Sequence, residues 1–325
     1  MLGRHNHIGC LSLRNLLTSL AVLPFCPVVA AMFPRPLRVV LDFDGTITAK
    51  DTIGTLADLG LQFQQRRGLN LSASWQKVLE DYGRDHADHV STYQPPVSDR
   101  VLLSEELAFL RGLQPVELRS VQRVEKSGIF RGMSREDLVK AGHEAQADGR
   151  VSLRSGFTKL MDEATQRGWS VSVVSVNWSR SFIAGVLSAY HFDDVVANEI
   201  ELDGSISGPD VLGPLAKDNV MTTSEDKLRA LRMLGARQGV SSGPGLVYFG
   251  DSTTDLECLL ETRGVVMTPG TESSLMKTLV RLGYSVPRIQ DVDQSCSSGP
   301  IAWASTFDEV LQSGFLAAGG RDSSC

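Results

Sequence analysis

The sequence predicts an α/β protein, a doubly wound parallel sheet with an α-helical cap domain inserted after the first strand. Three short apolar runs, at 39–41, 171–176 and 246–250, are typical of strands that are buried on both faces. Each run ends in polar residues, and helical patterns follow the runs, which favours a parallel sheet. About a hundred residues of helical pattern separate the first two runs, far more than an ordinary connection between a strand and a helix needs. We therefore expect these residues to form an inserted helical layer.

The same observations divide the chain into a core and a cap. We expect the core to be built from residues 37–50 and 155–316, and the cap from residues 51–154. Residues 1–36 are interpreted as a leader that is disordered or serves in targeting. Residues 317–325 are interpreted as a disordered tail, because chain ends are often poorly ordered unless they are tied down.

Start and stop signals place the helices of the cap. Asp51-Thr52 is typical of a helix start, since polar residues precede an apolar repeat, and the segment from Ser134 to Asp137 has a helix-capping signature. Pro95-Pro96 breaks the region into two parts. We expect helices that begin at 53 and at 135, and helices that cover 75–82, 104–113 and 115–126.

The core is predicted to alternate strands and helices. An amphipathic helix covers 156–167, and Asp203-Gly204 inside an alternating stretch at 200–206 indicates a β-hairpin. A helix that starts at Lys227 is expected to end at Gly235. The remaining predicted elements are a strand at 194–197, a last strand at 265–267, and helices at 178–190, 253–260, 273–282 and 307–315.

Composition and charge narrow the class of protein. The chain has 325 residues, of which 42% are hydrophobic and 22% charged, the profile of a globular protein. A formal net charge of -6 and only 6% aromatic residues argue against a general nucleic-acid binder. The five cysteines are scattered and form no zinc-binding pattern, and their odd number fits a reducing compartment.

The N-terminal stretch has features of a signal peptide that ends near Ala30-Ala31, or of a mitochondrial presequence. The first 41 residues contain arginines but no Asp or Glu, and the stretch from Leu16 to Phe33 is largely apolar. Pro24 and Pro27 interrupt this run, so we expect no stable membrane insertion. A start at Met32 would leave only a short arm before the first strand. We favour a cytoplasmic protein, with mitochondrial import as the alternative.

Two acids end the first strand. Asp42 and Asp44 are followed at once by Gly45, and ligands of open α/β sheets bind at the carboxyl ends of strands. Carboxylates this close repel each other unless their charge is offset, for example by Mg²⁺ with its oxygen ligands. One acid can then attack phosphorus while the other moves protons. For this stretch alone, an acid pair that only caps the next turn is an equally good interpretation.

Three further motifs follow in chain order. The second strand ends at Ser175, Lys227 opens a helix, and a strand ends in Asp251 with Asp255 four positions on. Together with Asp42-Phe43-Asp44-Gly45-Thr46, these residues resemble the four motifs of the haloacid-dehalogenase (HAD) superfamily: Asp-x-Asp-Gly-Thr, Ser/Thr, Lys and Gly-Asp-x-x-x-Asp. The cap position resembles the C1 position of the phosphoserine phosphatase branch, although the cap is longer here.

The resemblance implies the catalytic roles. Asp42 would be the nucleophile that forms an aspartyl phosphate, and Asp44 the general acid and base. Ser175 would hydrogen-bond a phosphoryl oxygen, and Lys227 would hold the nucleophile and the phosphoryl group together. Lys217 competes for the lysine role, and we prefer Lys227 because it opens the helix that leads to the fourth motif.

The resemblance also implies Mg²⁺ as the cofactor. The metal-binding residues would be Asp42, Asp44 through its backbone carbonyl, Asp251 and Asp255. Asp251 ends its strand and would bind the ion directly. Asp255 lies one helical turn further on, and would reach the ion directly or through Lys227 or water.

Four residues are expected to bind substrate, namely Thr46, Asp51, Val176 and Asn177. Related enzymes place an acid near Asp51 that faces the amine of the substrate, with plain helix capping as the alternative here. Val176-Asn177 departs from the Gly-Gly of phosphoserine phosphatases. Asn177 would either contact substrate or cap the next helix.

These expectations lead to a predicted function. We expect a Mg²⁺-dependent phosphatase that hydrolyses a small phosphomonoester through an aspartyl phosphate, and Asp44 disfavours dehalogenation. Its partner would be a small phosphorylated metabolite and not a nucleic acid, and the protein would be a monomer or a homodimer. The alternatives are a phosphomutase or phosphotransferase on the same core, and a non-catalytic protein that binds a phosphorylated ligand.

Overall fold

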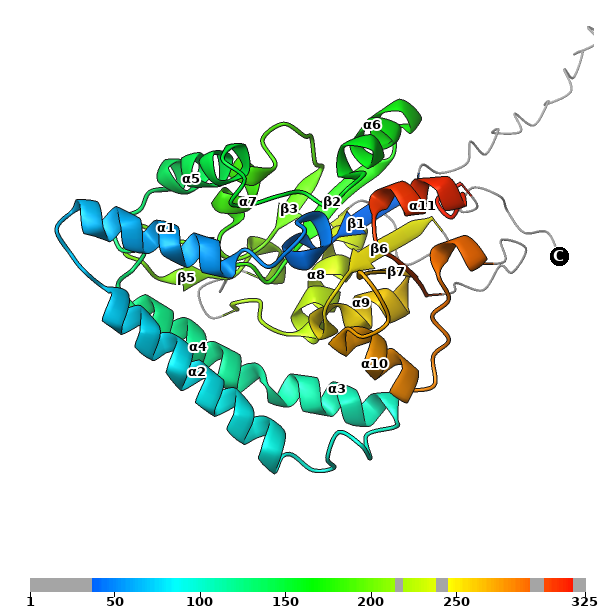
Figure 1. Ribbon diagram of the computed structural model, residues 1–325, viewed down its shortest axis with the longest axis horizontal. Coiled ribbons are helices and arrows are strands. Elements are labelled where there is room, and N and C mark those ends of the chain that lie inside the picture. The colour runs from blue at the N-terminus through cyan, green and yellow to red at the C-terminus, as the bar shows by residue number, and fades with distance from the viewer. Residues whose placement is uncertain (1–36, 214–218, 238–244, 293–300, 318–325) are drawn as a thin grey trace, which may run out of the picture. The chain divides into compact units, whose positions relative to one another are not determined.

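A parallel sheet lies at the centre of the computed structural model, which describes residues 37–213, 219–237, 245–292 and 301–317 (Figure 1). Within these residues the sheet has six strands in the order β3-β2-β1-β6-β7-β8. The strands are β1 (Arg38–Leu41), β2 (Ser170–Val174), β3 (Asp194–Val196), β6 (Leu246–Gly250), β7 (Arg263–Met267) and β8 (Ala302–Ala304). The chain builds β2 and β3 on one side of β1 and returns to the other side with β6. This confirms the predicted doubly wound sheet, and places the reversal of strand order at β1.

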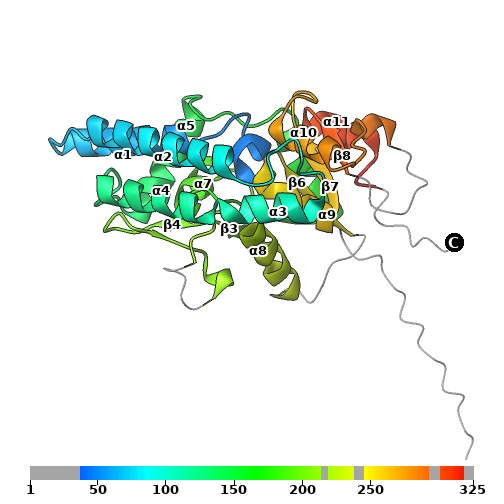
Figure 2. The same ribbon diagram turned by 90° about the horizontal axis from the view of Figure 1, so that it is seen from below.

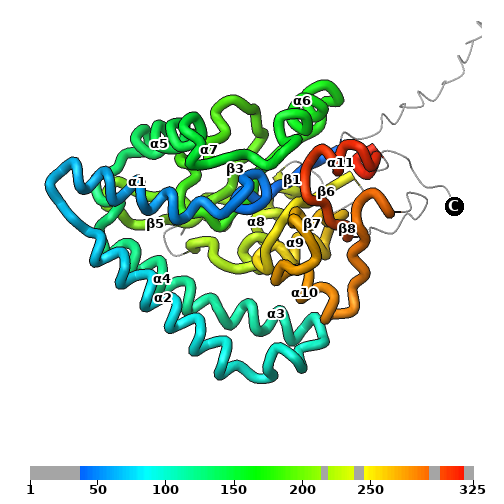
Figure 3. The backbone as a smooth tube through the Cα atoms, in the orientation of Figure 1, coloured from blue at the N-terminus to red at the C-terminus, as the bar shows by residue number. Residues whose placement is uncertain are grey.

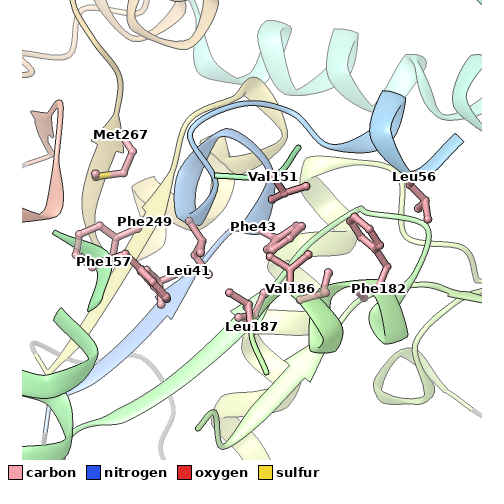
Figure 4. Packing of buried hydrophobic residues seen from close by; sticks show 14 of the residues in the cluster. Leu41, Phe43, Leu56, Val151, Phe157, Phe182, Val186, Leu187, Phe249 and Met267 are labelled. Carbon is pink, nitrogen blue, oxygen red and sulfur yellow. The ribbon is translucent and has the colours of Figure 1, made fainter. Parts of the chain in front are cut away.

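Helices cover both faces of the sheet, which fits the mainly apolar sequences of its strands. The core helices are α6 (Phe157–Arg167), α7 (Arg180–Val186), α8 (Ser224–Arg237), α9 (Leu256–Glu261), α10 (Ser274–Arg281) and α11 (Phe307–Ser313). Side chains alternate along β1, so Val39 and Leu41 join one hydrophobic cluster and Val40 joins the other. The first cluster includes residues of α6, α7 and α11, and Figure 4 shows it around Leu41, Phe157 and Phe249. The second includes residues of α8, α9 and α10.

Residues 51–154, all of which the structure describes, contain the expected helices between β1 and β2. They are α1 (Ile53–Arg66), α2 (Ser72–Thr92), α3 (Leu103–Gly112), α4 (Gln114–Ser127) and α5 (Arg135–Ala147). α2 and α4 run side by side in both views (Figures 1 and 2). The chain leaves and re-enters the core at neighbouring points, where the Ala49 N–H donates to the carbonyl of Ser152 (2.8 Å) (Figure 3).

The limits of the cap as a domain stay a prediction, because its helices share their hydrophobic clusters with the sheet. α1, α2, α4 and α5 contribute to the first cluster and α3 to the second. α5 packs directly on α7 at two glycines. A Cβ atom at Gly142 would overlap the carbonyl oxygen of Phe182, and one at Gly185 would overlap that of Val139. The two helix backbones therefore approach more closely than helices with larger side chains could.

Several predicted elements differ in extent. The strand at 265–267 is not the last one, because β8 follows it at the edge of the sheet, where three residues leave little pattern to detect. The helix expected at 178–190 is limited to Arg180–Val186, since Ser179 provides its cap by accepting from the Phe182 N–H (3.0 Å). The helix at Lys227 begins at Ser224 and continues past Gly235 to Arg237. The predicted hairpin is present as β4 (Glu199–Ile200) and β5 (Ile206–Ser207).

Some predictions concern residues that the structure does not describe. These are the leader at 1–36, the competing Lys217, and the tail beyond residue 317. Within the described residues, no helix is long and apolar enough to span a membrane.

Candidate active site

The turn after β1 brings the first motif to the carboxyl edge of the sheet. Asp42 follows β1 directly, and its backbone N–H donates to the carbonyl of Phe249 in β6 (2.8 Å). Gly45 has a φ of +69°, and a Cβ atom there would overlap the carboxylate of Asp251. Glycine at this position thus permits both the turn and the close approach of the first and fourth motifs. Thr46 completes the contact, as its hydroxyl donates to Asp251 Oδ1 (3.1 Å).

Lys227 lies between two buried carboxylates. Its Nζ is 2.7 Å from Asp42 Oδ1 and donates to Asp255 Oδ1 at 2.7 Å. The lysine side chain has no exposed surface. Burial lowers the pKa of Lys227, but the charges of Asp255 and Asp42 outweigh this effect and raise the pKa above its usual range. The ammonium group therefore stays charged and fixes the distance between the two acids.

Both carboxylate oxygens of Asp255 accept hydrogen bonds from the protein. Its Oδ1 also accepts from the Tyr248 hydroxyl (2.7 Å), and its Oδ2 accepts from the N–H groups of Asp251 and Ser252 (3.1 Å each). These bonds satisfy both of its oxygens with groups of the protein. Asp255 therefore positions Lys227 and the start of the fourth motif, whether or not it also reaches a cation.

The acidic cluster fits a divalent cation. Asp42, Asp251 and Asp255 each bring one carboxylate oxygen within 4.8 Å of the others, and one lysine offsets their charge only in part. Burial, and then the charge of Asp255, raise the pKa of Asp42 well above its ordinary value and that of Asp251 to about 7. Asp42 Oδ1 is buried and, apart from its ion pair with Lys227, has no hydrogen-bond partner among the described residues. A hard cation with oxygen ligands, such as Mg²⁺, would offset this charge.

Asp44 points away from this cluster. Its Oδ1 accepts from the Thr52 N–H (2.8 Å) and hydroxyl (2.5 Å), and its Oδ2 accepts from Asn177 Nδ2 (2.7 Å). Burial, followed by the charge of Asp51, raises the pKa of Asp44 to about 6, against the lowering effect of these hydrogen bonds. An acid with this pKa can both give and take a proton near neutral pH. Its carboxylate is outside the three-acid group, so only its backbone carbonyl remains as the predicted metal ligand.

The end of β2 supplies the second motif. Ser175 is fully buried, and its hydroxyl accepts from the Asn177 N–H (3.1 Å). Besides its bond to Asp44, Asn177 accepts from the Ser179 N–H through Oδ1 (3.0 Å). Asn198 fixes this loop by donating to the carbonyls of Val176 (3.0 Å) and Asn177 (3.2 Å). Asn177 therefore orients Asp44 and precedes the capping residue of α7.

The motifs meet in a pocket of about 420 Å³. Its core wall includes Asp42, Asp44, Ser175, Val176, Asn177 and Asp251, whereas Thr46, Lys227 and Asp255 are fully buried and are not among the lining residues. Asp51 also lines the pocket, and its Oδ1 accepts from the Ile53 N–H (2.9 Å) at the start of α1. Both interpretations of Asp51, substrate contact and helix capping, are therefore compatible with its position.

The whole set of motifs lies within one family model. Residues 39–260, more than half of the chain, match the model of the haloacid dehalogenase-like hydrolases. The chain belongs to this family.

The HAD hydrolase has relatives at moderate identity. It is 29% identical to a CTO1 family protein of Schizosaccharomyces pombe over 235 residues, which are 68% of this chain and 77% of that protein. It is 25% identical to the bifunctional TH2 protein, mitochondrial, of Arabidopsis thaliana over 79% of this chain but only 43% of that protein. A solved structure of a substrate-bound phosphoserine phosphatase has a TM-score of 0.47 and 15% identity, and the match covers 86% of this chain and 98% of the other.

Some residues of the HAD hydrolase hold the predicted site residues in place but were not predicted from the sequence. Arg154 donates to the carbonyls of Gly45, Thr46 (3.0 Å) and Ser305 (3.0 Å), and so braces the turn after β1. Thr52 is predicted only as part of a helix start, although it holds Asp44. Such roles depend on contacts between distant segments, and no spacing rule reveals them.

Proposed function

We propose that this HAD hydrolase is a Mg²⁺-dependent phosphatase that hydrolyses a small phosphomonoester through an aspartyl phosphate on Asp42. The proposal rests on the different surroundings of Asp42 and Asp44 at the end of β1, which suit the two acids to different steps of the reaction. Asp42 is held by a buried lysine beside two further acids, and Asp44 is held separately with a pKa of about 6. Both acids line the same pocket, which supports their action on one ligand.

The reaction would proceed in two steps. A carboxylate oxygen of Asp42 attacks phosphorus, the bond from phosphorus to the ester oxygen breaks, and the leaving oxygen takes a proton from Asp44. Water then attacks the phosphorus of the aspartyl phosphate, Asp44 takes a proton from that water, and inorganic phosphate leaves as the Asp42 carboxylate is restored. The proton that Asp44 gives in the first step is thus replaced in the second.

The other residues would bind and orient. Lys227 would hold Asp42 and offset charge on the phosphoryl oxygens, and the Ser175 hydroxyl would donate to one of them. Asn177 and Thr52 would aim Asp44 at the leaving oxygen. When bound, Mg²⁺ would offset the negative charge of the phosphate, with Asp42, Asp251 and the backbone carbonyl of Asp44 as its protein ligands.

The test is phosphate release by the full chain from a panel of phosphomonoesters, with Mg²⁺, with chelator, and with the Asp42→Asn variant. We expect release that needs Mg²⁺ and is lost in Asp42→Asn. Transfer of the phosphoryl group to a second alcohol without free phosphate would indicate a mutase instead. Binding of esters without any turnover by the folded protein would contradict the proposal and favour a binding role.

A further inference from the structure

The cap wall of the pocket differs in character from the core wall. It is formed by Trp75, Val78 and Tyr82 of α2, Glu117 of α4, and Trp178 after β2, with a few neighbours. The rings of Trp75 and Trp178 meet edge to face, with centroids 6.3 Å apart. Most of its side chains are aromatic or apolar, and the polar groups that residues 51–154 bring to the pocket are Asp51, Glu117, Ser120 and the Tyr82 hydroxyl.

The charged side chains that line the pocket, among the described residues, are all acidic. Among the described residues that line it, five are acids and none is Lys, Arg or His. The proposed chemistry uses three of these acids, Asp42, Asp44 and Asp251. Two remain, Asp51 at the start of α1 and Glu117 on α4, and neither forms an ion pair in the described part of the chain.

Glu117 has a single polar partner among the described residues. The Tyr82 hydroxyl donates to Glu117 Oε1 (3.0 Å), and the rest of the carboxylate has no other hydrogen-bond donor there. Burial raises the pKa of Glu117, as it does for an acid with no cation beside it. A partly buried acid among aromatic rings, with no cation of its own, is complementary to a positively charged ligand.

Resting on the function proposed above, we propose that the alcohol part of the substrate is a cation, an ammonium group or a positively charged nitrogen heterocycle. Glu117 is its counter-ion, and the rings of Trp75, Tyr82 and Trp178 enclose it. Aromatic faces attract such cations while tolerating their apolar surface, which a plain carboxylate site would not. The pocket volume of about 420 Å³ leaves room for an organic group beyond the phosphate.

The test compares esters of equal shape and different charge. Phosphocholine is paired with 3,3-dimethylbutyl phosphate, in which carbon replaces the charged nitrogen. A second pair, (N-methylpyridinium-4-yl)methyl phosphate and 4-methylbenzyl phosphate, separates a heterocyclic cation from an aliphatic one. We expect the full chain to have a kcat/KM at least roughly tenfold higher for the cation in one pair or both. Equal values within both pairs would overturn the inference.

The variant Glu117→Gln sharpens the result. It should abolish the preference, because KM should rise more for the cationic ester than for the neutral ester of the same pair. Glu80→Gln is the matched control, because it removes one exposed acid of α2 outside the pocket. A preference that survives Glu117→Gln would contradict the assigned counter-ion. The wild-type ratio tests the inference even where the variant does not fold.

Failure of the proposed function can be told apart from failure of this inference. If the protein hydrolyses p-nitrophenyl phosphate but has equal kcat/KM values within both ester pairs, the proposed phosphatase activity is supported and the cation site is contradicted. If no ester is hydrolysed, calorimetry with the same pairs decides the question. Tighter binding of the cationic ester that is lost in Glu117→Gln would support the site, and equal affinities would overturn it.

Discussion

The core wall and the cap wall of the pocket are held in place by different forces. On the core wall, Asp44 has three hydrogen bonds, and Asp42 is paired with a buried lysine. On the cap wall, Trp75 and Val78 are held by packing within a hydrophobic cluster. The positions proposed for chemistry are therefore fixed by directional contacts between distant segments. The positions proposed for specificity depend mainly on how α2 and α4 pack, and we expect them to tolerate substitution without disturbing the acids.

The largest effect should follow Lys227→Met on the core wall. The change leaves Asp42 and Asp255 buried without their cation, which should cost about 3–5 kcal/mol in the free energy of unfolding. Phosphate release should fall roughly 10²–10³-fold or more, because the charge that faces the phosphoryl group is lost. Urea unfolding and phosphate release measure the two effects. Lys140→Met, at a side chain that is 74% exposed, is the control, and a similar loss there would refute the special role of Lys227.

Asp44→Asn should separate chemistry from stability. The amide oxygen can still accept from Thr52, but the amide nitrogen would face Asn177 Nδ2, which is also a donor. The free energy of unfolding should therefore fall by about 1–3 kcal/mol. Loss of the acid and base should lower kcat roughly 10²-fold or more. Asp58→Asn, on the exposed face of α1, serves as the control. If kcat is unchanged in Asp44→Asn, Asp44 is not the proton-transferring group.

Asp251 offers a test through stability and pH. Its pKa in the folded protein is about 7, raised first by burial and then by Asp255, and an unfolded Asp titrates near about 4. Since the folded state binds the proton more tightly, ionising Asp251 costs stability. Without metal, the stability that protonated Asp251 contributes should be lost as the pH rises from about 4 to about 7.

Thermal unfolding in chelator checks this expectation. Asp251→Asn should raise the Tm above that of the wild type at pH 8 and abolish the gain in Tm that Mg²⁺ gives the wild type. Asp148→Asn, an exposed acid at the end of α5, should do neither. A Mg²⁺-dependent gain in Tm that persists in Asp251→Asn would place the ion elsewhere.

The smallest effect on generic activity should come from Val78→Ala on the cap wall. The side chain is buried, so the truncation should cost about 1–3 kcal/mol in the free energy of unfolding. Hydrolysis of p-nitrophenyl phosphate should stay within about threefold of the wild type, because the hydrogen bonds and ion pairs that hold the core acids do not involve Val78. Calorimetric unfolding and steady-state kinetics measure both, and a collapse of kcat would mean that the two walls are not independent.

The sequence predicted the strand ends well because each motif is local. Asp42 and Asp251 follow apolar runs directly, and parallel strands bring such positions to one edge. It could not predict that Asn177 and Thr52 meet on Asp44, because Asn177 is more than a hundred residues away from both. β8 was missed for a related reason, as its three residues become a strand only by pairing with β7.

The cap wall was the least predictable part of the site. Trp75 and Tyr82 were expected on an amphipathic helix, but a helical pattern does not say which side chains face the ligand. That depends on how α2 packs on α4, and the partnership of Tyr82 with Glu117 spans 35 residues. Helix packing angles follow from many side chains at once, so they cannot be derived from one segment.

The glycine contact between α5 and α7 bears on how such enzymes can be recombined. Gly142 and Gly185 leave no space for a side chain, so these helices fit only each other's surface. α5 is therefore joined to the core through its packing on α7, although it precedes β2 in the chain. A chimaera that exchanges the pocket-facing helices should be joined in the loop after Ser127, before α5. A junction placed after α5 would put a helix from another protein against α7, and the close packing at Gly142 and Gly185 would be lost.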